Sequence, residues 1–148
     1  MYLVERLAPI QFPLVNRFYK EAGHKGKARG DDVVFVLKAH GIIRAAVRLC
    51  PVEGRLFLRG LWVMPEFQRQ GLGSVLMQQV IEQYLQGRYC WCYPFAHLEV
   101  FYSQFGFKVV APESVPECIA GPYTAYTRAG KAILIMIRDD SDPESVPD

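Results

Sequence analysis

The sequence lacks the features that define membrane-spanning and exported proteins. Its longest apolar run, residues 132–137, is far shorter than the ~18 residues that a transmembrane helix requires. The start of the chain includes Glu5 and Arg6 and is not a basic segment followed by an apolar one, so no signal peptide is visible. We therefore expect a cytoplasmic protein without a membrane segment.

Cysteine is also scarce, which argues against a disulfide scaffold or a metal centre. Only 4 Cys and 3 His occur among the 148 residues. Cys90 and Cys92 are separated by one residue on an expected strand, whereas the cysteines of zinc knuckles and redox pairs are separated by two. We interpret them as buried thiols and predict no metal site. With 51% hydrophobic residues, a chain of this length is expected to form one domain over residues 1–138.

Charge is distributed unevenly along the chain. Five of the 15 acidic residues lie at or beyond Asp139, where no basic residue occurs, so residues 139–148 are predicted to form an acidic, disordered tail. Residues 1–138 then carry 17 basic and 10 acidic side chains, a net charge of +7. A positive domain suits a phosphorylated ligand or an acidic substrate.

Hydrophobic periodicity and turn residues predict an α+β fold. Alternating or β-branched apolar runs predict strands over residues 1–7, 33–39, 42–50, 55–63, 89–93, 107–110 and 131–138. Helical spacing predicts helices over residues 13–22, 72–85 and 96–105. Three prolines make residues 111–130 an expected irregular segment. We predict a mixed, mostly antiparallel central sheet, flanked by helices in a three-layer arrangement of the α/β type.

Residues 61–74 carry the most informative local pattern. A strand ends, a polar turn follows, and an amphipathic helix begins at Gly71-Leu72-Gly73. Unpaired amide groups and the helix dipole at such a place favour phosphate. The Walker pattern is excluded because no Gly-Lys-Ser/Thr occurs, and Leu76 replaces the third glycine of a dinucleotide fingerprint. Taken alone, the two glycines are better explained by a turn that packs the helix closely on the sheet.

Two patterns together resemble the GNAT superfamily of N-acetyltransferases. Gln68-x-x-Gly71-x-Gly73, preceded by Leu61-x-Val63-x-Pro65, resembles its acetyl-CoA-binding signature. Residues 101–107, in which Tyr102 near a helix end is followed by Gly106 and Phe107, resemble its second signature. The order of the expected elements fits the family's fold over almost all of residues 1–138. In that fold the fourth strand carries a bulge and splays from the fifth.

The resemblance implies that acetyl-CoA is the cosubstrate and that no metal takes part. Pantetheine would pair with the backbone near Leu61 and Val63, and the Val63 N–H would stabilise the oxyanion. The turn that precedes the helix would wrap the diphosphate, with Arg69 adding a positive charge. The implied cofactor-binding residues are Leu61, Trp62, Val63, Gln68, Arg69, Gln70, Gly71, Leu72, Gly73 and Ser74.

The resemblance also implies catalytic roles. Tyr102 would be the general acid, because a phenol with a pKa near ~10 can protonate the departing thiolate. Family members often carry a glutamate on the fourth strand, but residues 55–63 contain none. Glu99 is therefore the candidate base, with His97 as an alternative, although a solvated helix surface explains either residue more simply. Phe95 stands where the family often has an asparagine that contacts the cofactor.

These features predict an enzyme that transfers an acetyl group from acetyl-CoA to a primary amine by direct attack in a ternary complex. The acceptor could be a small molecule, a peptide N-terminus or a lysine. The alternative is a non-catalytic acyl-CoA-binding sensor or interaction module on the same fold. Residues 17–29 are basic and would lie near the acceptor in a family member, but we favour a solvated surface loop. Nucleic-acid binding is not expected, and the chain is predicted to be a monomer or a homodimer.

Overall fold

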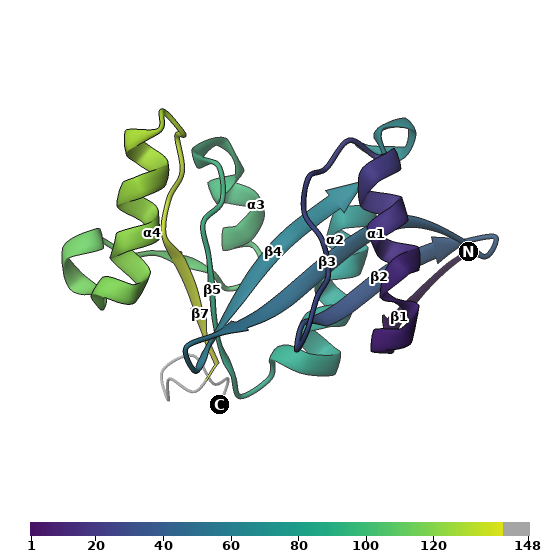
Figure 1. The fold of residues 1–148 in the computed structure, drawn as a ribbon, viewed down its shortest axis with the longest axis horizontal. Helices are drawn as coiled ribbons and strands as arrows, with labels where there is room; N and C mark the ends of the chain where they lie inside the picture. The colour runs from purple at the N-terminus through teal and green to yellow at the C-terminus, as the bar shows by residue number, and fades with distance from the viewer. Residues whose placement is uncertain (141–148) are drawn as a thin grey trace. The chain divides into compact units, whose positions relative to one another are not determined.

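The computed structural model describes residues 1–140, which form two compact units, Met1–Tyr84 and the residues from Leu85 onward. The first unit contains four antiparallel strands in the order in which they occur in the chain (Figure 1). They are β1 (Tyr2–Leu7), β2 (Val33–Ala39), β3 (Ile42–Val52) and β4 (Arg55–Val63). The strands predicted over residues 1–7, 33–39, 42–50 and 55–63 are therefore confirmed, with ends that differ by no more than a few residues.

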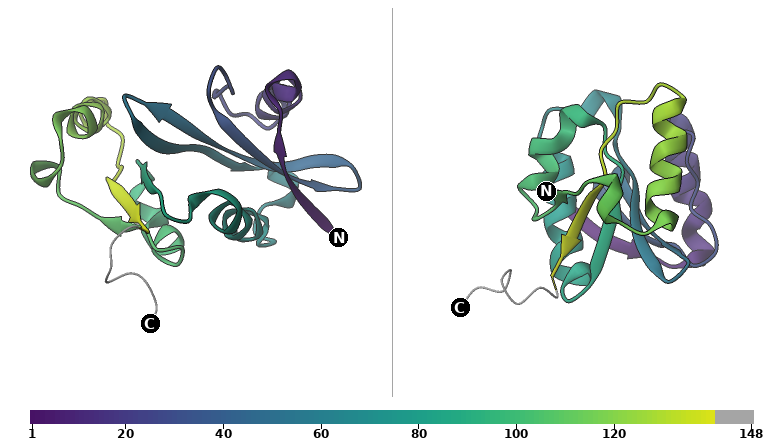
Figure 2. Two further views of the ribbon diagram at one scale, coloured as in Figure 1. Left: turned by 90° about the horizontal axis from the view of Figure 1, so that it is seen from below. Right: turned by 90° about the vertical axis from the view of Figure 1, so that its left-hand side faces the viewer.

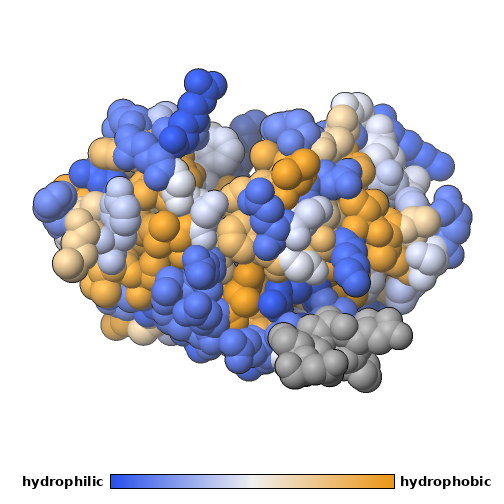
Figure 3. Space-filling model, turned by 180° about the vertical axis from the view of Figure 1, so that it is seen from behind, coloured by the Kyte–Doolittle hydropathy of each residue, from blue (hydrophilic) through white to orange (hydrophobic). Residues whose placement is uncertain are grey.

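Two helices cover opposite faces of this four-stranded sheet (Figure 2). Helix α1 (Phe12–Glu21) buries four side chains at helical spacing, and Pro13 lies in its first turn, where a missing N–H costs nothing. Helix α2 (Leu72–Val80) likewise buries an apolar stripe and continues into a wider turn over Ile81–Leu85. Seen from behind, the surface mixes hydrophobic and hydrophilic residues (Figure 3).

Between Leu85 and residue 140 the second unit contains three strands, of which the last in sequence is central. Strand β7 (Met136–Asp139) pairs antiparallel with β5 (Tyr89–Cys92) on one side and with β6 (Lys108–Val109) on the other. A short turn, Ala96–Leu98, leads into α3 (Glu99–Ser103), so the helix predicted over residues 96–105 is present in two parts. Cys90 and Cys92 are both buried free thiols, as expected. Antiparallel strands flanked by helices in both units confirm the predicted fold class.

The prediction of an irregular segment over residues 111–130 is wrong. Helix α4 (Glu117–Arg128) occupies most of it, with Pro116 at its N-cap and Pro122 inside it. Ile119 is the buried residue of this helix, and its carbonyl accepts a hydrogen bond from the Tyr93 hydroxyl at 2.7 Å, which ties α4 to the segment after β5.

The strand predicted over residues 131–138 is wrong in its first half. Residues before Met136 make single backbone bonds instead of a ladder, among them the bond from the Leu134 N–H to the Pro94 carbonyl at 2.9 Å. Pro94 has no N–H to return, and the chain turns into a helix soon after it, so a regular ladder cannot continue there.

The acidic end of the chain is only partly described. Asp139 ends β7, and the Asp140 carboxylate accepts a hydrogen bond from the Gly87 N–H at 3.2 Å and lies 3.3 Å from the Arg138 guanidinium. These two residues were assigned to the tail, yet they belong to the second unit. The rest of the predicted tail, residues 141–148, lies outside the described residues. Within residues 1–140, none of the helices has both the length and the apolar character needed to cross a membrane.

Candidate functional site

Strand β4 carries a bulge near its end, as the resemblance implied. Arg59 pairs with Arg48 and Trp62 with Ala46, so two residues of β4, Gly60 and Leu61, stand opposite one residue of β3. Gly60 has a φ of +66°, which is the left-handed conformation that the first residue of this kind of bulge adopts. A bulge interrupts strand pairing and re-aims the residues that follow it, which here are Trp62 and Val63.

The buried side chain of Tyr19, from α1, and the partly buried side chain of Arg48, from β3, lie against this bulge. The Tyr19 hydroxyl donates a hydrogen bond to the Gly60 carbonyl at 2.7 Å. A Cβ atom at Gly60 would lie 2.8 Å from that hydroxyl and 2.9 Å from Nε of Arg48, so no larger residue fits. Burial raises the pKa of Tyr19 above its ordinary value, although nearby Arg48 opposes the shift. Tyr19 therefore remains a neutral hydrogen-bond donor.

The turn between β4 and α2 leaves backbone amide groups without helical partners. Arg69 and Gly71 both adopt left-handed conformations, with φ of +68° and +80°, and Gly71 is the N-cap of α2. The Val75 N–H donates to the Gly71 carbonyl, which makes it the first bond within the helix. The N–H groups of the first turn, from Leu72 to Ser74, have no carbonyl to bind inside the helix, and a glycine N-cap offers no side chain. This end of α2 is suited to an anion.

Side chains around the turn fix its position. Gln68 donates through Nε2 to the Val63 carbonyl at 3.1 Å, so its amide ties the turn to the end of β4. The Arg44 guanidinium lies over the Phe67 ring, 4.2 Å from its centre, and places a positive charge next to the turn. Gln70 and Arg69 are exposed, and Gly73 and Ser74 are partly buried in the first turn of α2.

Tyr102 lies in α3, in the second unit. Its side chain is 7% exposed and meets the rings of Phe101 and Phe107 edge-on, with centroid distances of 5.1 and 5.7 Å. Burial, with a smaller effect of Cys92, raises the pKa of Tyr102 above its ordinary value. Within residues 1–140 its hydroxyl has no hydrogen-bond partner. Tyr102 is therefore a protonated phenol held by aromatic packing.

The second signature positions this phenol through its backbone. The Tyr102 carbonyl accepts hydrogen bonds from the N–H groups of Phe105 and Phe107, at 3.0 and 3.2 Å. Gly106 has a φ of +88°, and a Cβ atom there would lie 3.3 Å from Nε of Arg138. That nitrogen donates to the Phe105 carbonyl at 2.8 Å, so the glycine gives the chain room to turn against Arg138.

The other residues considered for proton transfer lie at the surface. Glu99 is the first residue of α3 and is exposed, as is His97 in the preceding turn. Phe95 is 50% exposed and stacks on His97 with a centroid distance of 6.0 Å. The assignment of Glu99 as a base stays a prediction. Among residues 1–140, no group of three or more His, Cys, Asp or Glu side chains is placed to hold a metal ion.

Residues 30–109, more than half of the chain, match the family model described as "Acetyltransferase (GNAT) domain". The chain belongs to the GNAT acetyltransferase family. No curated protein matches the sequence. The match includes β4, the turn, α2 and Tyr102, so both of the stretches that carried the resemblance lie inside it.

Solved structures show the same fold at low identity. The ribosomal-protein-S18-alanine N-acetyltransferase from Escherichia coli is 20% identical, with a TM-score of 0.67 and 100% coverage of both chains. The N-acetylglutamate synthase from Neisseria gonorrhoeae, complexed with coenzyme A and N-acetyl-glutamate, is 15% identical, with a TM-score of 0.63 over 93% of this chain and 35% of that one. A PaiA N-acetyltransferase from Thermoplasma acidophilum, in complex with coenzyme A, is 13% identical, with a TM-score of 0.58. The match covers 94% of this chain and 99% of that one.

Two features of this GNAT chain were not found from the sequence. The role of Tyr19 depends on a contact between α1 and β4 that no local pattern reveals. The exact place of the bulge could have been found, because an isolated glycine inside a strand is a known signal of one, and Gly60 is such a residue.

Proposed function

We propose that this chain transfers an acetyl group from acetyl-CoA to a primary amine by direct attack in a ternary complex. Membership of the GNAT family supports acyl transfer. Coenzyme A is bound in two of the solved structures of similar fold, which supports an acyl-CoA as the donor. The observation that carries the proposal is the amino end of α2, whose first-turn amides are free to bind a diphosphate.

The donor would be held by backbone groups. The amides of Leu72, Gly73 and Ser74 would bind the diphosphate, with the Arg69 guanidinium adding positive charge. Pantetheine would lie along the end of β4, hydrogen-bonded to Leu61 and Val63 in the manner of an added strand. The bulge at Gly60 supports this role because it interrupts regular pairing just before these residues.

The chemistry needs an oxyanion donor and a proton source. The acceptor nitrogen attacks the thioester carbonyl carbon, and the Val63 N–H stabilises the charge that develops on oxygen. When the carbon–sulfur bond breaks, the thiolate takes the phenolic proton of Tyr102, giving free coenzyme A. The amide nitrogen gives up its extra proton to water or to Glu99, and the Tyr102 phenolate regains a proton from water. Burial raises the pKa of Tyr102, so the phenol is protonated at neutral pH before each transfer.

The experiment that tests this function separates turnover from binding. Coenzyme A binding is measured by calorimetry, and thiol release from acetyl-CoA is measured with a panel of small amines and peptides and without any amine. Amine-dependent thiol release supports the proposal. Binding without turnover on any amine would instead support a non-catalytic acyl-CoA sensor, for which the absence of a carboxylate on β4 is the favouring observation. Failure to bind coenzyme A would contradict both functions.

A further inference from the structure

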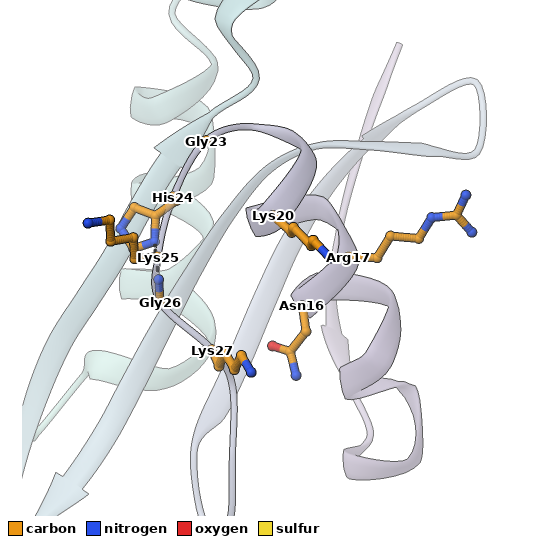
Figure 4. Close-up of a pocket in the computed structure, with 8 residues that line it drawn as sticks. All are labelled: Asn16, Arg17, Lys20, Gly23, His24, Lys25, Gly26 and Lys27. Carbon is orange, nitrogen blue, oxygen red and sulfur yellow. Dashed lines mark hydrogen bonds between the residues drawn. The ribbon is translucent and has the colours of Figure 1, made fainter.

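A basic depression lies in the first unit between α1 and the segment that follows it. Its volume is about 670 Å³. In Figure 4, Lys27 and Asn16 point toward one another across it, while Arg17 and Lys25 extend outward. No carboxylate occurs among the eight residues that line it, all of which belong to the described part of the chain. The side chains that line the depression are those of Asn16, Arg17, Lys20, His24, Lys25 and Lys27.

The segment that forms this depression is held in place by specific contacts. Asn16 binds both backbone groups of Ala28, accepting from its N–H at 2.7 Å and donating to its carbonyl at 3.2 Å. Arg48, from β3, donates through Nη1 to the Lys27 carbonyl at 2.7 Å. A Cβ atom at Gly26 would lie 2.5 Å from Nη2 of Arg48, so only glycine permits this approach. The cations of the depression are exposed, but the backbone of the segment that carries Lys25 and Lys27 is held by these contacts.

His24 connects the depression to the end of β4. Its Nδ1 accepts a hydrogen bond from the Gly26 N–H at 2.8 Å, so the neutral ring carries its proton on Nε2 and is a donor there. Burial, with the charge of Arg48, lowers the pKa of His24 and favours this neutral form. The ring lies against Trp62, at a centroid distance of 5.1 Å, and Trp62 directly precedes Val63. His24, which lines the depression, therefore packs against the residue that precedes the proposed oxyanion donor in the chain.

We propose that this depression binds the carboxylate or phosphate of an acceptor that also carries the amine to be acetylated. The inference rests on the proposed acetyl transfer. A simple ammonium ion would be repelled by Lys20, Lys25 and Lys27, whereas an acceptor with an anionic group is attracted and oriented by them. The same positive charges favour loss of a proton from the acceptor's ammonium group, which the attack requires.

Binding is tested first, without reliance on turnover. O-phosphoethanolamine and β-alanine are titrated into the full chain saturated with coenzyme A, and ethanolamine and propylamine serve as matched amines without an anionic group. Backbone amide shifts in the NMR spectrum report the site. We expect saturable shifts at Lys20, His24 and Lys27 with at least one of the two anionic amines and none with the neutral-chain amines. If neither anionic amine shifts these residues, the inference is wrong, whatever the turnover.

A charge-matched pair of variants tests the cations. In Lys20→Gln/Lys27→Gln both cations are removed from the depression, whereas in Arg29→Gln/Lys108→Gln the same charge is lost from exposed residues that do not line it. We expect the first variant to weaken binding of the anionic amine roughly tenfold or more, as loss of one or two charge-assisted hydrogen bonds should. The control variant should bind as the wild type does. Equal weakening in both variants would indicate a general charge effect and overturn the inference.

Turnover then distinguishes this inference from the proposed function. The ratio of kcat/KM for the anionic amine to that for its neutral partner should be large in the wild type and should approach one in Lys20→Gln/Lys27→Gln. Preservation of that ratio in the variant overturns the inference but leaves acetyl transfer intact. A comparison of O-phosphoethanolamine with β-alanine identifies whether phosphate or carboxylate is preferred. Absence of coenzyme A binding, by contrast, would contradict the proposed function itself.

Discussion

The Tyr19 hydroxyl donates a hydrogen bond to the Gly60 carbonyl oxygen, joining α1 to the bulge of β4 at a distance of 2.7 Å. Tyr19 is fully buried, and Gly60 is the left-handed residue of the bulge. The conformation of β4 just before its proposed substrate-binding residues thus depends on a helix that contributes none of the groups assigned to acetyl-CoA. Stability and donor binding should therefore respond together when this contact is removed.

Tyr19→Phe should lower the free energy of unfolding and weaken the binding of acetyl-CoA. The change removes the hydrogen bond to the part-buried Gly60 carbonyl, which costs about 1 kcal/mol. Urea unfolding gives the first quantity, and the KM for acetyl-CoA gives the second. Tyr89→Phe is the control, because the Tyr89 side chain is 53% exposed. A stability loss without any rise in KM would limit Tyr19 to a structural role.

Gly60→Ala should destabilise the protein more than Gly54→Ala does. Both glycines have positive φ values, +66° and +77°, so each substitution incurs a backbone cost of about 1–2 kcal/mol. At Gly54 a Cβ atom meets nothing within 4 Å, whereas at Gly60 it would lie 2.8 Å from the Tyr19 hydroxyl. Thermal and urea unfolding of the two variants measure the difference. Equal losses would mean that β4 can shift to relieve the contact.

Stability should fall as the pH rises above about 10, the ordinary pKa of tyrosine. Burial raises the pKa of Tyr19, so above that pH the unfolded chain loses the proton that the folded chain keeps. The unfolded state then binds fewer protons, and the free energy of unfolding decreases by up to about 1.4 kcal/mol per pH unit for each such tyrosine. Unfolding measured from pH 9 to 11 should show a shallower decline in Tyr19→Phe. Identical slopes in the two proteins would contradict the assignment.

Tyr102→Phe should reduce kcat by about 10²-fold or more while the affinity for coenzyme A stays the same. The variant keeps the aromatic packing on Phe101 and Phe107 and removes only the proton donor. Because burial raises the pKa of Tyr102, ionisation of this residue should not lower the wild-type rate below pH ~10. Thiol release across this pH range measures both effects, with Tyr89→Phe again as the control. Unchanged turnover in Tyr102→Phe would remove the acid role.

Local sequence patterns were sufficient where neighbouring residues determine the structure. The meander over β2, β3 and β4 follows from β-branched runs separated by short turns, and α2 follows from its apolar stripe and the glycines before it. Helix α4 was missed because the three prolines of residues 111–130 suggested an irregular segment, whereas burial of Ile119 and the hydrogen bond from Tyr93 stabilise a helix. Such contacts join residues distant in sequence, and no local pattern contains them.

In the candidate site, too, local patterns predicted some features, whereas others depend on contacts between residues distant in sequence. The turn before α2 was predicted from its residues, whereas the roles of Gln68 to Ser74 and of Tyr102 were implied by the family resemblance and stay predictions. The basic segment after α1 was interpreted as a solvated loop, because its composition alone gives no sign that Arg48 and Asn16 hold it. The depression depends on those two contacts and on the packing of His24 against Trp62. The family resemblance placed this segment near the acceptor, but the depression itself and the contacts that hold it are visible only in the structure.

The central claim is that the amides at the start of α2 bind the diphosphate of coenzyme A, and calorimetry tests it most directly. Coenzyme A and pantetheine, which has no diphosphate, are titrated into the wild type, Gly71→Val and Gly41→Val. The two glycines are matched, with φ of +80° and +74° and no atom within 4 Å of a Cβ position. We predict tighter binding of coenzyme A than of pantetheine, and a loss of roughly tenfold or more in Gly71→Val alone, as expected when a charge-assisted anion site is disturbed. Failure of the wild type to bind coenzyme A, or equal affinity in all three proteins, would contradict the account.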